Sequence, residues 1–375
     1  MATRDFNWDL LFEILSRADL ETLRKCRILS RECNALTYKS TFLRSHCERT
    51  YTLCGYLIHS LQQGRSYSTF SSIHNPGVNP KSISFDFLPA RRVRILAGAD
   101  IGLFFCQSHE PQTTNYYICK PTTLQWELVP KHDFCNLNCS KPYSYFIMVL
   151  TSNPLRFKIL GLHIHIGSCT LCCAIFYSDI WGWKQLDDFK LPDSEHLFLF
   201  MDATSACGRL HWVTNILGKD QYYKILSFDQ DKESWESISV PDACNNLLVY
   251  RINLAVYQGK LAIMGHIRDT ATVEVWVMRN NSEYKWWEKI FTFNQDCLRK
   301  QQPTATLVSF CDAHTVLVWE CSRGEYSRAV FYNFNNGQST IHNLDNFKSY
   351  PFNMFSRYLE SVYFLHADYE PVQFK

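Results

Sequence analysis

The chain has 375 residues, with 38 basic and 36 acidic side chains and a formal net charge of +2. Hydrophobic residues make up 46% and charged residues 20%, which excludes a wholly disordered or fibrous protein. The near balance of charge argues against a dedicated nucleic-acid or polyanion binder, and the aromatic share of 15% favours β-structure.

The first 50 residues predict a small unit of three helices. The first helix has apolar residues at helical spacing, namely Leu10, Leu11, Ile14 and Leu15. Asn7 can cap this helix, Asp19 can cap a second helix that carries Leu23, and helical spacing continues through Cys33 to Leu36. A unit of this size has little interior. Its apolar side chains therefore either pack within it or partly await a partner.

From about Tyr51 onward the pattern changes to short apolar and aromatic runs separated by turn residues, which is typical of all-β structure. A repeat search finds one recurring unit, in which a β-like run and a polar turn precede a large apolar anchor. The anchors recur every 52–57 residues and are Phe70, Trp126, Trp183, Trp235, Trp287 and Ile341. In three units an aromatic residue stands seven positions before the anchor, at Phe176, Phe228 and Phe334.

Each unit has room for about four short strands, which is the content of a β-propeller blade. Kelch-type repeats have a period near ~50 residues, and residues 51–375 hold about six units of that length. The sequence therefore predicts a kelch-like β-propeller with six blades. The run from Tyr358 to Leu365 is expected to pair with the first blade, because such closure hides open strand edges. The competing architecture is a sandwich of two sheets, which the regular period disfavours.

Neither the start of the chain nor its apolar runs indicate a membrane or secretory segment. No apolar segment follows a basic start, as a secretory signal requires. The longest apolar runs are far shorter than the ~20 residues that span a bilayer. We expect a soluble protein of the cytoplasm or nucleus, with no membrane partner.

The 16 cysteines are expected to be reduced thiols rather than a disulfide scaffold. Some have the spacing of metal ligands: Cys135 with Cys139, and Cys169, Cys172 and Cys173 downstream of His163 and His165. The second group leads into a β-like run, which favours core thiols over zinc. The two histidines on one strand face fit a copper or zinc pair, but an ordinary strand edge is the commoner case. We therefore expect no metal and no cofactor.

The sequence contains no motif for catalysis or nucleotide binding. It has no G-x-x-x-x-G-K-[ST], G-x-G-x-x-G, H-E-x-x-H or G-x-S-x-G pattern. The acidic run Asp229-x-Asp231-x-Glu233 lacks the glycine and the distant glutamate of an EF-hand loop. A solvated turn is therefore favoured over calcium binding, and a non-enzymatic protein is expected.

Two parts of the chain resemble one known family. The stretches WDLLFEILSR (8–17), LRKCRILSR (23–31) and FLRSH (42–46) resemble an F-box. The stretch from Tyr116 to Pro130 resembles the hallmark segment of plant F-box-associated domains, and Leu103 to Cys106 fits the same pattern. The two features occur in the order expected of plant F-box proteins and together cover nearly the whole chain.

This resemblance implies a substrate receptor of a Skp–cullin–F-box ubiquitin ligase. Residues 1–50 would bind a Skp-type adaptor and, through it, a cullin. Residues 51–375 would recruit an unidentified protein for ubiquitylation and proteasomal degradation. By carry-over, four residues would lie in or under the adaptor-facing surface: Leu10, Ile14, Leu15 and Leu23.

The sequence departs from the F-box pattern at three positions. Asn7 and Asp19 stand where prolines are usual, and Cys33 stands where a tryptophan is usual. These differences remove rigid helix entries and a large apolar contact, so we expect a weakened adaptor interaction.

Two alternatives to the ligase function stay open. One is a stand-alone propeller module that does not act through ubiquitin, and the other is a kelch-type metal oxidase, which needs a Cys beside a Tyr and two converging histidines.

Overall fold

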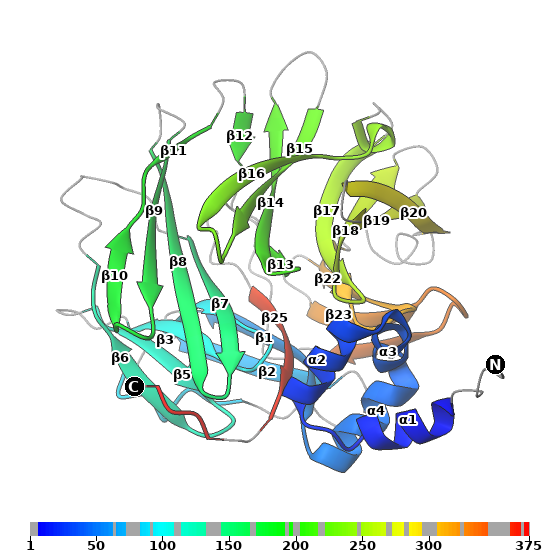
Figure 1. Cartoon of the computed structure of the whole chain (residues 1–375), viewed down its shortest axis with the longest axis horizontal. Coiled ribbons are helices and arrows are strands. Elements are labelled where there is room, and N and C mark those ends of the chain that lie inside the picture. The colour runs from blue at the N-terminus through cyan, green and yellow to red at the C-terminus, as the bar shows by residue number, and fades with distance from the viewer. Residues whose placement is uncertain are drawn as a thin grey trace, which may run out of the picture.

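A computed structural model describes residues 7–62, 65–72, 83–90, 93–108, 114–132, 144–165, 170–191, 195–197, 203–216, 222–245, 249–267, 272–280, 285–294, 306–322, 326–343, 361–368 and 371–374. These residues form a group of helices followed by a ring of six β-sheets (Figure 1). The predicted architecture, a helical unit followed by a six-bladed propeller, is therefore confirmed.

The N-terminal unit, called the head (residues 7–50), has four helices: α1 (Trp8–Leu15), α2 (Leu20–Leu29), α3 (Arg31–Thr37) and α4 (Ser40–Thr50). The predicted count of three is wrong, because Ser30 adopts an extended conformation and ends α2. Its hydroxyl accepts a hydrogen bond from the Cys33 backbone N–H at 3.2 Å, which starts α3 as a new helix. The predicted caps at Asn7 and Asp19 are confirmed, since each side chain accepts a bond from a backbone N–H three residues on, at 3.0 and 2.7 Å.

The six sheets are the blades of the propeller, and their strand pairs are antiparallel. In order across each sheet, blade 1 has β2 (Arg65–Ser72), β1 (Leu53–Gln62) and β25 (Ser361–Ala367). Blade 2 has β3 (Val93–Gly98), β4 (Phe104–Ser108), β5 (Tyr116–Lys120) and β6 (Gln125–Val129). Blade 3 has β7 (Ser144–Ser152), β8 (Leu155–His165), β9 (Thr170–Tyr177) and β10 (Gly182–Gln185).

The remaining blades follow in chain order. Blade 4 has β12 (Glu195–Leu197), β14 (Arg209–Ile216), β15 (Tyr222–Asp229) and β16 (Ser234–Ser239). Blade 5 has β17 (Val249–Tyr257), β18 (Lys260–Ile267), β19 (Thr272–Asn280) and β20 (Lys285–Asn294). Blade 6 has β21 (Thr306–Phe310), β22 (Thr315–Ser322), β23 (Tyr326–Asn333) and β24 (Ser339–Asn343). Short extra pieces are β11 (Phe189–Lys190) beside β9, β13 (Thr204–Ala206) beside β14, and the 3-10 turn η1 (Asp242–Asn245).

The ring closes through strands from the two ends of the chain. β25 pairs with β1 in a register that places His366 opposite Cys54. This pairing confirms the predicted closure for the part that begins at Ser361, whereas residues 358–360 lie outside the described residues. Because β25 completes the sheet that β1 and β2 begin, closure covers an edge of β1 that would otherwise be open.

The hydrophobic core is divided among the seams between blades. In the described residues, six clusters of buried side chains each combine two neighbouring blades. Trp212 of blade 4, for example, packs in one cluster with Leu160 of blade 3, and Phe157 of blade 3 packs in another with Phe105 of blade 2. Burial of each such side chain stabilises the fold by about 1.5–3 kcal/mol. The seams between blades, rather than one central core, therefore hold the ring together.

Candidate functional site

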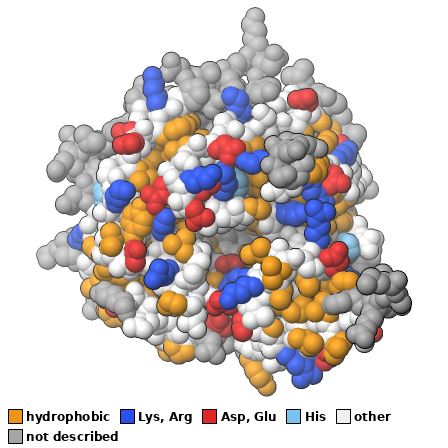
Figure 2. Space-filling model, in the orientation of Figure 1, with side chains coloured by type: hydrophobic (Ala, Val, Ile, Leu, Met, Phe, Trp, Pro, Cys, Tyr) orange, Lys and Arg blue, Asp and Glu red, His pale blue; other side chains and the backbone are white. Residues whose placement is uncertain are grey.

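Five large apolar side chains of the head are exposed. Trp8, Leu10 and Ile14 of α1 are 45%, 57% and 57% exposed, and Ile28 and Leu29 at the end of α2 are 85% and 83% exposed. Figure 2 shows hydrophobic side chains gathered over the head at the lower right of the view. Exposed apolar groups of this size on a small unit are typical of an interaction site.

Helix α1 is apolar on two sides. Leu11, Phe12 and Leu15 pack into the core of the head. Leu10 and Ile14, which are four residues apart and lie on one helical face, are exposed instead. A helix at a protein surface normally has one apolar stripe. The second stripe packs against nothing in the head, and a partner of matching apolar surface could cover it.

The structure divides the four predicted adaptor residues into two pairs. Leu10 and Ile14 lie on the surface, whereas Leu15 and Leu23 are 4% and 0% exposed. The buried pair belongs to the core of the head, together with Leu20 and Phe42. Leu15 and Leu23 therefore support the surface from below and cannot themselves touch a partner without a rearrangement of the head.

Ion pairs along the polar edge of α1 hold this helix against α4. Arg49 of α4 contacts the two carboxylate oxygens of Glu13 at 2.9 and 3.0 Å and also donates to the Ser16 hydroxyl. Arg17 adds a third contact to Glu13 at 3.1 Å. The hydrogen bond from Arg49 lowers the pKa of Glu13 and keeps its carboxylate charged. The exposed stripe is thus presented by a helix with a defined orientation.

Ile28 and Leu29 were not among the predicted interface residues. The apolar spacing predicted that helical structure continues beyond them to Cys33 and Leu36. Instead, α2 ends at Leu29, and the chain turns at Ser30. The signal that could have shown this is Ser30 itself, because serine after an apolar run is a common start of a new helix.

The head docks on turns that join the first and second strands of the blades (Figure 1). The side-chain amide of Asn34 donates to the carbonyl of Gln258, in the turn between β17 and β18, at 3.1 Å. Arg24 lies 3.5 Å from Asp100, in the turn between β3 and β4. Because these turns stand at the same end of their blades, the head occupies one face of the ring.

Gly259 shows how closely the head and the ring approach each other. Its φ is +75°, a conformation that side chains rarely adopt, and a Cβ atom there would lie 3.0 Å from the Tyr38 hydroxyl of the head. Glycine at this turn therefore permits both the backbone conformation and the approach of the head.

The six blade anchors all lie on end strands of their sheets. These strands are β2, β6, β10, β16, β20 and β24. The indole N–H of Trp183 in blade 3 donates to the carbonyl of Pro130, which follows blade 2, at 2.8 Å. The indole of Trp287 in blade 5 donates in the same way to Ser239 of blade 4, at 2.8 Å. At both positions, the tryptophan ties one blade to the blade before it.

The other four anchors differ in their surroundings. Trp126 and Ile341 are 37% and 43% exposed, Trp235 stacks on Phe189, and Phe70 is 4% exposed in the seam between blades 1 and 2.

In the last unit, the seven-residue gap between Phe334 and Ile341 does not correspond to a pair of opposite residues in the sheet. Ile341 pairs with Val330 of β23, whereas Phe334 lies beyond the end of that strand. In blades 3 and 4, by contrast, Trp183 and Trp235 pair with the aromatic residues seven positions earlier. The turn before β24 therefore has a different register from the turns that precede the tryptophans.

The sequence pattern described as "F-box associated beta propeller domain" matches residues 56–366, which is most of the chain. The chain belongs to this family. F-box protein At5g41720 of Arabidopsis thaliana is 30% identical over 173 residues, which cover 43% of this chain and 87% of that protein. F-box/LRR-repeat/kelch-repeat protein At2g27520 of the same plant is 22% identical and covers 86% of both chains.

The F-box protein CPR1 of Arabidopsis thaliana is 25% identical over 76% of this chain and 72% of that protein. With these relatives, the resemblance to plant F-box proteins with an associated propeller is confirmed. Among solved structures, TolB from Acinetobacter baumannii matches 79% of this chain and 65% of its own, at 13% identity and a TM-score of 0.43.

No helix among the described residues has both the length and the apolar character needed to cross a membrane.

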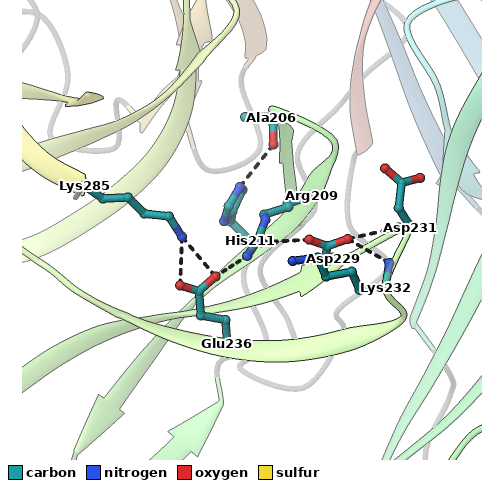
Figure 3. A network of polar contacts seen from close by, with 8 residues as sticks. All are labelled: Ala206, Arg209, His211, Asp229, Asp231, Lys232, Glu236 and Lys285. Carbon is teal, nitrogen blue, oxygen red and sulfur yellow. Dashed lines mark hydrogen bonds and ion pairs between the residues drawn. The ribbon is translucent and has the colours of Figure 1, made fainter. Parts of the chain in front are cut away.

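In this F-box protein, the acidic run of blade 4 forms a hydrogen-bonded turn (Figure 3). One carboxylate oxygen of Asp229 accepts from the backbone N–H groups of Asp231 and Lys232, at 3.0 and 2.9 Å, and the other lies 2.7 Å from Arg209. The bond from Lys232 is the main cause of the lowered pKa of Asp229. The carboxylate thus shapes the turn between β15 and β16.

The same network continues into blade 5. Arg209 also contacts Glu236, whose carboxylate accepts from Lys285 at 2.8 and 3.0 Å. The third acidic residue of the run, Glu233, accepts from Lys158 of blade 3 at 2.7 Å. These charges join blades 3, 4 and 5 across two seams.

Of the cysteines with metal-like spacing, Cys135, Cys139 and Cys169 lie outside the described residues. Cys172 and Cys173 are buried in β9, and Cys172 is opposite the buried His163 of β8. His165 ends β8, and its side chain is outside the described part of the molecule.

Proposed function

We propose that this F-box protein is a substrate-recognition subunit of a Skp–cullin–F-box ubiquitin ligase. In this proposal, the head binds a Skp-type adaptor and thereby a cullin, and the propeller recruits a protein for ubiquitylation and proteasomal degradation. The observation that carries it is the second apolar stripe of α1. Leu10 and Ile14 are exposed on a helix whose other side is buried and whose orientation ion pairs hold.

The proposed role needs no bond-making chemistry from this chain. A receptor that holds a target near a ubiquitin-conjugating enzyme raises the local concentration of the target's lysines. The chain would therefore be a non-catalytic subunit, active in the cytoplasm or nucleus. Its balanced charge agrees with a protein target rather than a nucleic acid.

The position of the head favours one face of the ring for the target. The head covers turns between first and second strands, and antiparallel pairing places the connections between second and third strands at the opposite end of each blade. A target bound at that opposite end does not compete with the head or the adaptor. We therefore propose the face away from the head for substrate docking.

The adaptor contact is tested by binding of a purified plant Skp-type adaptor to the full chain. Leu10 and Ile14 are each 57% exposed, so covering them contributes about 1–1.7 kcal/mol each. Leu10→Asp with Ile14→Asp is therefore expected to weaken binding by at least about 20-fold. Ile180→Asp is the matched control, because Ile180 is 68% exposed but belongs to the turn between β9 and β10 of blade 3 and not to the head.

Two results would overturn the proposal. One is a wild-type chain that fails to bind any Skp-type adaptor, which would favour the stand-alone propeller module instead. The other is a double variant that binds as well as wild type, which would place the contact elsewhere. Circular dichroism confirms that each variant retains its fold.

A further inference from the structure

Four side chains of the kind that bind zinc meet where the head joins the ring. His46 and Cys47 come from α4, Cys54 from β1 and His366 from β25. Possible ligand atoms of His46, Cys47 and His366 all lie within 4.8 Å of one another. Within the described ranges this is the one group of three or more His, Cys, Asp or Glu side chains with such spacing.

The hydrogen bonds of His46 leave one ring nitrogen directed to this group. Its Nε2 lies 2.9 Å from the carbonyl of Ala18, and a carbonyl can only accept, so Nε2 carries the proton. Within the described part of the chain, the unprotonated Nδ1 has only long contacts, at 3.4 and 3.5 Å, to the hydroxyls of Thr50 and Thr52. Metal-binding histidines commonly donate their other N–H to a backbone carbonyl in this way.

His366 supplies a second imidazole in a suitable orientation. Its side chain is buried, and its Nε2 has no hydrogen-bond partner among the described residues. The rings of His366 and His46 are 5.4 Å apart and nearly perpendicular, at 82°. Buried polar atoms without a partner are rare in folded proteins. The imidazole of His366 also contacts the Cys47 thiol, and a metal ion bound at Nε2 would give this nitrogen a partner.

The two thiols complete a set of four donors. Cys54 is directly opposite His366 in the pairing of β1 with β25, which places their side chains on the same face of the sheet. Cys47 contacts the thiol of Cys54, and this hydrogen bond together with burial raises the pKa of Cys54. The Thr52 hydroxyl, 3.6 Å from the Cys47 sulfur, can donate to a thiolate there.

We infer that His46, Cys47, Cys54 and His366 form a structural zinc site. Two thiolates and two neutral imidazoles are a common ligand set for tetrahedral zinc. Zinc bonds of about 2.0–2.3 Å place neighbouring ligand atoms roughly 3.3–3.8 Å apart, which is a small contraction for His46, Cys47 and His366. Cys54 lies outside that 4.8 Å group and would join it from its contact with Cys47. Zinc binding releases one proton from each thiol, and the two thiolates then balance the charge of the ion. All four positions are filled by protein, so the site is structural and not catalytic.

The site would join three segments that are far apart in the sequence. It links α4 of the head to β1 and β25, whose pairing closes the ring. The ion would therefore set the orientation of the head relative to the propeller, and its loss would loosen the head and the closing strand together.

The test begins with the full chain, purified with reductant and without chelator. Elemental analysis is expected to find about one zinc ion per chain. Removal of an outer-shell partner of a metal typically weakens binding by about 10–100-fold, so removal of a ligand by Cys47→Ala or His366→Ala is expected to exceed that loss. Cys33→Ala is the control, because Cys33 is a partly buried thiol of the head outside the group.

Binding of Co²⁺ tests directly whether the thiols are metal ligands, because its absorption would not change if the cysteines only packed in the interior. Co²⁺ in the wild-type chain is expected to show thiolate-to-cobalt charge-transfer absorption, which Cys47→Ala reduces and Cys33→Ala retains. Cys47 is partly exposed, so Cys47→Ala tests the site even if His366→Ala fails to fold. The inference is overturned if folded wild-type protein binds neither zinc nor cobalt, if Cys47→Ala retains full binding, or if thiol titration finds Cys47 and Cys54 joined in a disulfide.

Discussion

Asp368 follows the closing strand and forms an ion pair with Lys120 at the end of β5, at 2.5 Å. The side chain of Lys120 is 4% exposed and that of Asp368 is 36% exposed. Replacing Asp368 with Asn removes one carboxylate charge that faces a buried ammonium group. Breaking a fully buried pair costs about 3–5 kcal/mol. Because water reaches Asp368 in part, we expect about 2–3 kcal/mol, measured as the free energy of unfolding in urea.

A second substitution distinguishes the buried charge from a local packing defect. Lys120→Met in the Asp368→Asn background is expected to restore most of the lost stability, because methionine leaves no charge in the interior. Asp187→Asn, at an exposed acidic residue of blade 3, is the control and should change stability little. The reasoning fails if Asp368→Asn is within about 0.5 kcal/mol of wild type, or if Lys120→Met adds to the loss.

Three further predictions concern the seams and the head. Trp287→Phe removes the indole N–H that donates to the carbonyl of Ser239. The free energy of unfolding is expected to fall by about 0.5–1.5 kcal/mol in the same urea assay. An unchanged free energy of unfolding would mean that this hydrogen bond contributes nothing. Leu23→Asp places a charge in the core of the head and should unfold the head. The expected readout is rapid proteolysis within residues 7–50. Leu10→Asp, at an exposed position, should resist the protease as well as wild type does. Burial lowers the pKa of His211 from 6.5 to about 4, so below pH 6.5 the unfolded chain binds a proton that the folded chain does not. His211 alone should then make stability fall by up to about 1.4 kcal/mol per pH unit between pH 6.5 and 4. The fall should be less steep by that amount in His211→Gln, and equal slopes would contradict the assignment.

The repeat pattern was predictable because its spacing is local. Trp183 and Trp235 stand on a strand that follows a tight turn, so the distance to their partner residues is fixed by the hairpin. At Ile341 the same seven-residue gap does not correspond to a strand pair, because the turn before β24 has another register. The closing strand was predictable for a different reason, since a ring of blades leaves open edges unless its ends pair.

The head was predictable in its helices but not in its exposure. Helical spacing shows that Leu10 and Leu15 belong to one helix, but it does not show which of them faces another helix, because both sides of α1 are apolar. The group around His46 and His366 left no sequence signal of its own. Its members come together only when β25 pairs with β1, and short ligand spacings are what a sequence search recognises.

The pairing of β1 with β25 has a consequence for how the protein is made. β1 leaves the ribosome soon after the head, but its partner β25 follows only after the strands of the other five blades. Until β25 has been made, β1 therefore presents an edge without its partner, and contacts of the head with His366 cannot form. A chain cut short by a premature stop codon keeps a complete head and most of its blades, yet never closes. Synthesis of β25 thus decides when the ring closes and when His366 reaches the head.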